Sequence, residues 1–201
     1  DYLTRIKASA APGDVVFFAS LRMRKLGDQW GSFDRAEVVK EQNSAEAKAK
    51  YQEARQETAS LIDTLRQLGL HVLIDAPKPV FSSPAFRCSD PFNRENPVCA
   101  AGFEEERGFL LAHRQPIMES LGQLAKEFPD LIVWDPFPLL CPTDPCSAFD
   151  QEGNPLFFDG DHLSAQGNRV LYLSFVALLQ TLWLPPEDKA VAKPKTSASA
   201  P

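Results

Sequence analysis

The stretch Gly13-Asp14-Val15-Val16-Phe17-Phe18-Ala19-Ser20 decides the fold class of this chain. Pro12 and Gly13 form a turn signal, and five consecutive apolar residues, 15–19, follow it. A continuous apolar run bounded by turn residues is typical of a strand that is buried on both faces, as in parallel sheets. We therefore expect residues 15–19 to form a strand within an α/β domain.

Two later runs have the same character. His71-Val72-Leu73-Ile74-Asp75 stops at Ala76-Pro77, and Leu131-Ile132-Val133-Trp134-Asp135 follows Pro129-Asp130. Both are short, apolar and bounded by turn residues, so we expect two more buried strands.

Segments rich in helix formers separate these runs. Composition predicts helices over residues 44–68 and 104–128, the second bent or restarted near Pro116. Residues 2–11 are expected to form the end of a helix. A final helix is expected over 165–183, with Ser164 as its N-cap. Strand and helix therefore alternate, which predicts a three-layer α/β architecture around a parallel sheet.

In such sheets, ligands bind beyond the carboxyl ends of the strands. Asp75, Asp135, Asp159 and Ser20 all fall at or just past such ends in the expected arrangement. This edge is where we expect the functional site.

The segment Phe158-Asp159-Gly160-Asp161-His162-Leu163-Ser164 carries the chemistry that the sequence suggests. A carboxylate on the Nδ1 side of an imidazole fixes its tautomer and leaves Nε2 free to accept a proton from a hydroxyl group. We interpret Asp159 as the orienting carboxylate and His162 as the general base. Asp161 is expected to point to solvent or to help cap the following helix.

Two other interpretations of this segment stay open. His162 could be a surface histidine whose neighbouring acids only cap the helix. Alternatively, Asp159, Asp161 and His162 could bind a cation, but the sequence offers no second group of ligands to complete a metal site. We expect no metal and no cofactor, and we interpret His71 and His113 as structural.

The four cysteines form two close pairs in sequence, Cys88 with Cys99 and Cys141 with Cys146. Neither pair has the Cys-x-x-Cys spacing of a zinc site. Three pairings are possible, of which the local one is the simplest. We expect disulfides rather than free thiols, and therefore an oxidising compartment.

Composition excludes other classes of protein. The 201 residues suffice for one domain, and a net charge of −6 argues against a nucleic-acid partner. Residues 1–7 contain no apolar signal segment, and the apolar run over 170–184 is too short to span a membrane. We expect a domain over residues 1–184 and a disordered tail over 185–201, rich in Lys, Ala, Ser and Pro.

A nucleophile is harder to find. The sequence contains neither a Gly-x-Ser-x-Gly elbow nor a Gly-Asp-Ser segment. Ser20, just after the first expected strand, is the best-placed serine, but no glycine flanks it to form a tight turn.

The chain resembles the SGNH hydrolase-like domain attached to acyltransferase-3 membrane proteins. The resemblance covers most of residues 10–184 and rests on residues 13–20, on Cys141-Pro142 with Cys146, and above all on residues 156–167. It implies a flavodoxin-like fold and a Ser-His-Asp triad, in which Asp159 and His162 are the matching residues. It also implies O-acylation of a cell-envelope polysaccharide in the periplasm, with an acyl donor, a polysaccharide acceptor and an acyltransferase-3 membrane domain in the same polypeptide.

The chain departs from the family at two points. The Gly-Asp-Ser block that carries the serine nucleophile is absent, and the oxyanion-hole Gly and Asn blocks are not evident. We expect the first βα unit to lie outside these residues, so that this chain alone is inactive. A stand-alone esterase or lipase, or a non-catalytic glycan-binding remnant of the fold, are the alternative functions.

Overall fold

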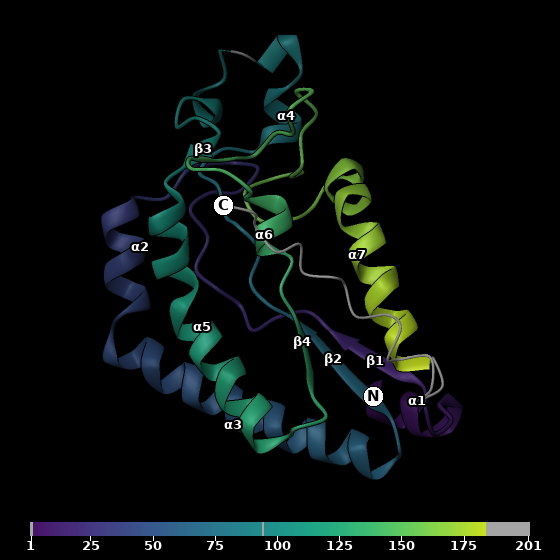
Figure 1. Cartoon of the computed structure of the whole chain (residues 1–201). Coiled ribbons are helices and arrows are strands. Elements are labelled where there is room, and N and C mark those ends of the chain that lie inside the picture. The colour runs from purple at the N-terminus through teal and green to yellow at the C-terminus, as the bar shows by residue number, and fades with distance from the viewer. Residues whose placement is uncertain (1, 94, 184–201) are drawn as a thin grey trace, which may run out of the picture.

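A parallel sheet lies at the centre of the computed structural model, which describes residues 2–93 and 95–183 (Figure 1). Its strands are β1 (Val15–Phe18), β2 (His71–Asp75) and β4 (Ile132–Trp134), in the order β1-β2-β4. All pairings are parallel, with Val15 opposite His71 and Ile74 opposite Val133. The carboxyl ends of the three strands therefore meet at one edge, as the sequence predicts.

The two faces of the sheet are covered by different helices. Val16, Val72 and Val133 pack with α3 (Ala45–Gln67) and α5 (Arg107–Glu127). On the other face, Phe175 of α7 (Ala165–Trp183) contacts Phe17, with ring centroids 5.1 Å apart, and Trp134 at 4.9 Å. Since strand side chains alternate between faces, the result is the predicted three-layer α/β architecture (Figure 1).

The long helix α3 agrees with the prediction for residues 44–68. Ser44 caps it, because its hydroxyl oxygen accepts a hydrogen bond from the N–H of Ala47. Gly69 ends it with a φ of +75°, a left-handed conformation that favours glycine. Buried Ile62 and Leu65 join the cluster against α5.

The helix predicted over 104–128 differs at its start and its middle. Glu104–Glu105 form a short strand, β3, which pairs antiparallel with β5 (Cys146–Ser147), so α5 begins at Arg107. Of the two alternatives expected near Pro116, a bend or a restart, the restart was wrong, because α5 is continuous there. Pro116 removes a single backbone donor, and burial of Ile117 and Leu121 holds the helix against the core.

One helix of two turns was not predicted. α2 (Arg35–Gln42) is capped by Asp34, whose carboxylate accepts a hydrogen bond from the N–H of Glu37. Only Val38 and Gln42 are buried, so the segment lacks an apolar periodicity that would reveal it. The remaining elements are α1 (Tyr2–Ser9), α4 (Ala85–Cys88), η1 (Pro91–Asn93), η2 (Pro97–Cys99) and α6 (Phe137–Leu140).

Both disulfides form with the local pairing, Cys88–Cys99 and Cys141–Cys146. Cys141 and Cys146 are fully buried, and they tie the loop after α6 to β5. The tail predicted to be disordered, residues 185–201, lies outside the described residues.

Candidate functional site

The Asp/His segment forms a tight loop immediately before α7. The Phe158 N–H donates to the carbonyl oxygen of His162 at 2.7 Å, and Phe157 and Leu163 form a bridge across the loop. Ser164 then caps α7, as predicted: its hydroxyl oxygen accepts the N–H of Gly167 at 3.1 Å. The loop therefore begins and ends on fixed backbone contacts.

Gly160 seats this loop against two distant segments. A Cβ built on Gly160 would lie 2.4 Å from the carbonyl oxygen of Gly27 and 2.5 Å from that of Phe81. The Phe81 N–H donates to the Gly160 carbonyl oxygen at 2.7 Å. Glycine is required here because the backbones approach so closely.

Asp159 contacts His162 through both backbone and ring. Its Oδ1 accepts the His162 N–H at 2.8 Å, and its Oδ2 lies 2.9 Å from Nδ1 of the ring. The carboxylate can thus accept a hydrogen bond from a protonated Nδ1. In that tautomer Nε2 has a free lone pair. The Asp159 side chain is buried, whereas that of His162 is 67% exposed, so the free side of the ring is open to a substrate.

The electrostatics keep Asp159 ionised. Burial by itself would raise the pKa of this carboxyl group. Hydrogen bonds from the backbone N–H groups of Asp161 and His162, together with the imidazole, outweigh burial and hold the pKa below its usual range. A carboxylate that stays charged can stabilise a protonated imidazole beside it.

Asp161 does not simply face solvent or cap the helix, contrary to the expectation. Its Oδ1 accepts a hydrogen bond from Nζ of Lys25 at 2.8 Å and lies 3.2 Å from Nδ1 of His162. Ligand atoms of Asp159, Asp161 and His162 come within 4.8 Å of one another. The Lys25 ammonium already supplies a positive charge beside Asp161, which disfavours a cation at this carboxylate.

The other polar residues of this sheet edge have partners of their own. Asp75 binds Lys78 and accepts the Ser20 N–H, and Asp135 accepts from the buried Arg114 at 2.8 Å. The Ser20 hydroxyl is buried and has no hydrogen-bond partner among the described residues. The structure therefore brings Ser20 to Asp75 and not to His162.

Within the described residues, no serine hydroxyl group hydrogen-bonds to His162. Of the other histidines, His113 is buried in α5 and its Nε2 lies 2.8 Å from the Arg24 carbonyl oxygen. His71 lies at the start of β2, at the opposite end of the sheet from the carboxyl edge.

Sequence reasoning missed the residues that support the loop. Lys25, Gly27 and Phe81 are far from Asp159 in sequence, and each is unremarkable in type. Only the three-dimensional fold shows that they hold the loop in place.

Comparison with known families decides the identity of the domain. Residues 1–175 match the family described as "SGNH domain (fused to AT3 domains)". The chain belongs to this SGNH family. No curated protein and no solved structure gave a significant match.

The family places this SGNH domain with acyltransferase-3 proteins, and hence with acyl-transfer or ester chemistry and a membrane-linked protein. Among residues 2–93 and 95–183, no helix has the length and apolarity needed to cross a bilayer.

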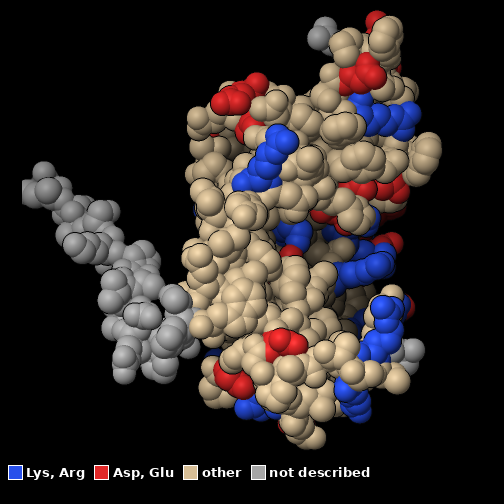
Figure 2. Space-filling view, turned by 90° about the vertical axis from the view of Figure 1, so that its right-hand side faces the viewer, with Lys and Arg blue, Asp and Glu red and all other residues tan. Residues whose placement is uncertain are grey.

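The side of the SGNH domain shown in Figure 2 has a broad surface with few charged residues, and Lys and Arg side chains gather beside a hollow.

Proposed function

We propose that this SGNH domain transfers an acyl group, most simply acetyl, to hydroxyl groups of a cell-envelope polysaccharide. The observation that carries the proposal is the contact between a buried, ionised Asp159 and the Nδ1 side of an exposed His162 ring. This arrangement suits a general base that acts on a hydroxyl group.

The proposed reaction has two steps. A serine hydroxyl attacks the carbonyl carbon of an acyl donor while Nε2 of His162 accepts its proton, and the leaving group departs with that proton. A sugar hydroxyl then attacks the acyl-serine. His162 takes the proton of the sugar and returns it to the serine, and the sugar carries the new ester. Asp159 stabilises the imidazolium in both steps.

The serine would come from sequence preceding Asp1. β1 pairs only with β2 among the described strands, and its residues are apolar on both faces, which is typical of a central strand. A preceding strand paired with the free edge of β1 would end at the same sheet edge. The loop after β1 reaches the Asp/His segment through Lys25 and Gly27, which supports this placement.

We place the domain on the periplasmic side of the membrane, joined to an acyltransferase-3 membrane domain in the same polypeptide. The family description supports the membrane partner. The two disulfides support an oxidising compartment.

The test uses the full-length parent protein in its native host. Mass spectrometry of the purified polysaccharide compares acylation by the wild type, His162→Ala and the control His71→Gln. The proposal expects acylation to fall to background for His162→Ala and to persist for the control. Undiminished acylation with His162→Ala would refute the proposal.

A non-catalytic glycan-binding role is the second candidate. It is favoured by the observation that no described serine hydroxyl contacts His162. A fluorophosphonate probe, which reacts with activated serines, separates the two. Labelling of the full-length parent that disappears in His162→Ala supports catalysis, and absence of labelling in the wild type supports the binding role. Hydrolysis of p-nitrophenyl acetate without a sugar acceptor would instead indicate the third possibility, a plain esterase.

A further inference from the structure

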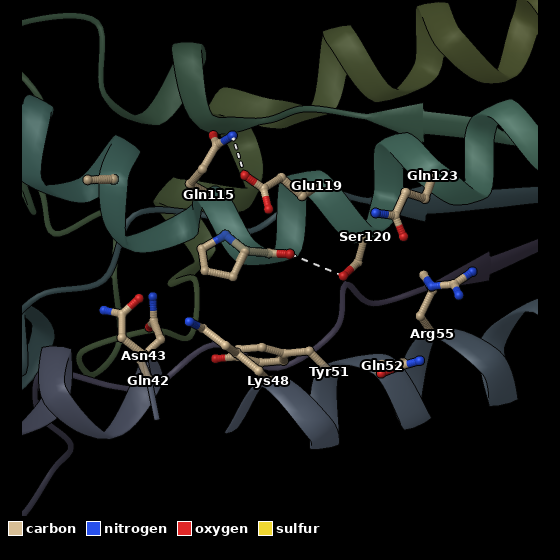
Figure 3. Close-up of a pocket in the computed structure, with 12 residues that line it drawn as sticks. Gln42, Asn43, Lys48, Tyr51, Gln52, Arg55, Gln115, Glu119, Ser120 and Gln123 are labelled. Carbon is tan, nitrogen blue, oxygen red and sulfur yellow. Dashed lines mark hydrogen bonds between the residues drawn. The ribbon is translucent and has the colours of Figure 1, made fainter. Parts of the chain in front are cut away.

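A second hollow lies away from the Asp/His segment, between α3 and α5 (Figure 3). Its volume is about 610 Å³, within the range of small-molecule sites. Its wall is mostly polar and includes four glutamines together with a tyrosine and a serine: Gln42, Gln52, Gln115, Gln123, Tyr51 and Ser120.

Several hydrogen-bonding groups on this wall are unused. Gln42 is only 3% exposed, and its Nε2 donates to the His113 carbonyl oxygen, while its Oε1 has no partner in residues 2–93 and 95–183. Within the part of the chain that is described, the side chains of Tyr51, Gln52 and Gln123 form no hydrogen bond. Of these groups, Gln42 is buried and Tyr51 is half-buried, whereas Gln52 and Gln123 are exposed. A buried or half-buried group gains free energy when a ligand supplies its missing partner.

The backbone adds one more acceptor. Pro116 has no N–H, so the carbonyl oxygen of Ala112 lacks its usual helical donor. Both residues line the pocket. A ligand in the pocket could therefore donate a hydrogen bond to the Ala112 carbonyl oxygen in place of the N–H that Pro116 lacks.

The charges of the pocket are largely balanced from within the protein. Arg55 pairs with Glu127 at 3.7 Å, and in net charge Lys48 offsets Glu119, which accepts a hydrogen bond from the neutral amide of Gln115 at 3.2 Å. Lys48 is the one lining cation without an ion pair among the described residues. Burial raises the pKa of Tyr51, which keeps its hydroxyl group neutral and able both to donate and to accept.

We propose that this pocket binds a neutral, hydroxyl-rich glycan segment. Amides and a phenol both donate and accept hydrogen bonds, as sugar hydroxyl groups do. The ring of Tyr51 offers an apolar face for the C–H side of a sugar. A polar wall does not suit an acyl chain, and the internal charge balance does not favour an anion.

The pocket also has a route toward the Asp/His segment. Tyr51 lines both this pocket and a neighbouring hollow of about 1200 Å³. Lys25 lines that neighbouring hollow, and its ammonium binds Asp161 beside His162. If the proposed function holds, a polysaccharide acceptor bound at Tyr51 could extend past Lys25 to the site of acyl transfer.

The test is an NMR titration of the ¹⁵N-labelled 201-residue chain with four neutral tetrasaccharides: cellotetraose, maltotetraose, chitotetraose and mannotetraose. We expect at least one to shift amide signals within residues 42–55 and 112–123. Tyr51→Ala should weaken that binding about 5- to 10-fold, and Tyr51→Phe less, because it removes only the hydroxyl group. Gln67→Ala, an exposed glutamine at the far end of α3, is the control and should bind like the wild type.

The outcomes separate this proposal from the proposed function. If none of the four sugars shifts these signals, or if Tyr51→Ala binds as well as Gln67→Ala, the pocket proposal is wrong, whatever the acylation assay shows. Stronger shifts with inorganic phosphate than with any sugar would also overturn it, in favour of an anion site. Binding should persist in His162→Ala, because the pocket does not include the catalytic pair.

Discussion

One carboxylate, that of Asp159, fixes both the backbone and the ring of His162. Oδ1 accepts the backbone N–H at 2.8 Å, and Oδ2 lies 2.9 Å from Nδ1. Because the backbone bond sets where the ring can reach, the orientation of the imidazole is built into the loop before a substrate arrives. Such preorganisation is what a general base requires.

Asp159→Asn should separate the effect of Asp159 on the tautomer of the His162 ring from its effect on the position of the His162 backbone. The asparagine oxygen can still accept a hydrogen bond from the backbone N–H. The amide nitrogen, however, can only donate, so it cannot accept a hydrogen bond from Nδ1–H. The substitution therefore favours the tautomer with the proton on Nε2. We expect acylation by the full-length parent to fall by about 10²–10⁴-fold. Melting monitored by circular dichroism serves as the control for folding. A rate within a few-fold of the wild type would show that Asp159 only stabilises the loop.

Gly160→Ala should disrupt the seat of the loop. Its Cβ would meet the carbonyl oxygens of Gly27 and Phe81 at 2.4 and 2.5 Å, and backbone cannot move away as a side chain could. We expect a loss of about 1–3 kcal/mol in the free energy of unfolding, measured in urea. The matched control is Gly122→Ala in α5, where an added Cβ meets nothing within 4 Å. That variant should gain up to about 1 kcal/mol, and equal effects of the two substitutions would contradict the account.

His113 should make stability depend on pH. Burial lowers the pKa of its imidazole, helped by the charge of Arg35 and opposed by the bond to the Arg24 carbonyl. Below about pH 6.5 His113 becomes protonated in the unfolded chain, whereas burial opposes its protonation in the folded chain. The contribution of His113 to the free energy of unfolding is therefore lost as the pH falls through the lowered folded pKa. His113→Gln keeps a donor toward Arg24 without titrating.

Urea unfolding at several pH values between neutral and mildly acidic checks this prediction. The free energy of unfolding should fall more steeply with decreasing pH in the wild type than in His113→Gln. Parallel curves for the two proteins would show that His113 does not titrate differently in the folded and unfolded chains.

The two disulfides should contribute unequally to stability. Loop closure alone favours Cys88–Cys99, with 11 residues of separation against 5 for Cys141–Cys146, and each bond is worth about 2–3 kcal/mol on that basis. Cys141 and Cys146 are fully buried, however, so replacing both with Ala also leaves space in the core. We expect the Cys141→Ala/Cys146→Ala variant to lose more free energy of unfolding in urea than Cys88→Ala/Cys99→Ala. The reverse order would mean that loop length dominates.

Much of the fold could be predicted because its signals are local. The three strands are short apolar runs, and α3 and α7 have caps at Ser44 and Ser164. The parts that were missed depend on tertiary structure. α2 has only two buried residues, and Glu104–Glu105 leave the predicted helix because they pair with β5, some 40 residues later in the chain.

The candidate site divides in the same way. Asp159 and His162 are three residues apart, so their contact could be predicted from the sequence. The roles of Lys25 and Gly27 depend on a loop more than 130 residues away. Asp161 was expected to face solvent because the sequence gives no sign of its contact with Lys25, which only the fold brings close.

The tautomer of His162 is the most direct test of the central claim, that Asp159 holds the Nδ1 side of the ring and leaves Nε2 free. Long-range ¹H–¹⁵N NMR on the 201-residue chain at alkaline pH distinguishes the two ring nitrogens. The account predicts a protonated Nδ1 and an unprotonated Nε2 in the wild type, with this preference lost in Asp159→Asn. A proton on Nε2 in the wild type, or the same tautomer mixture in both proteins, would contradict it.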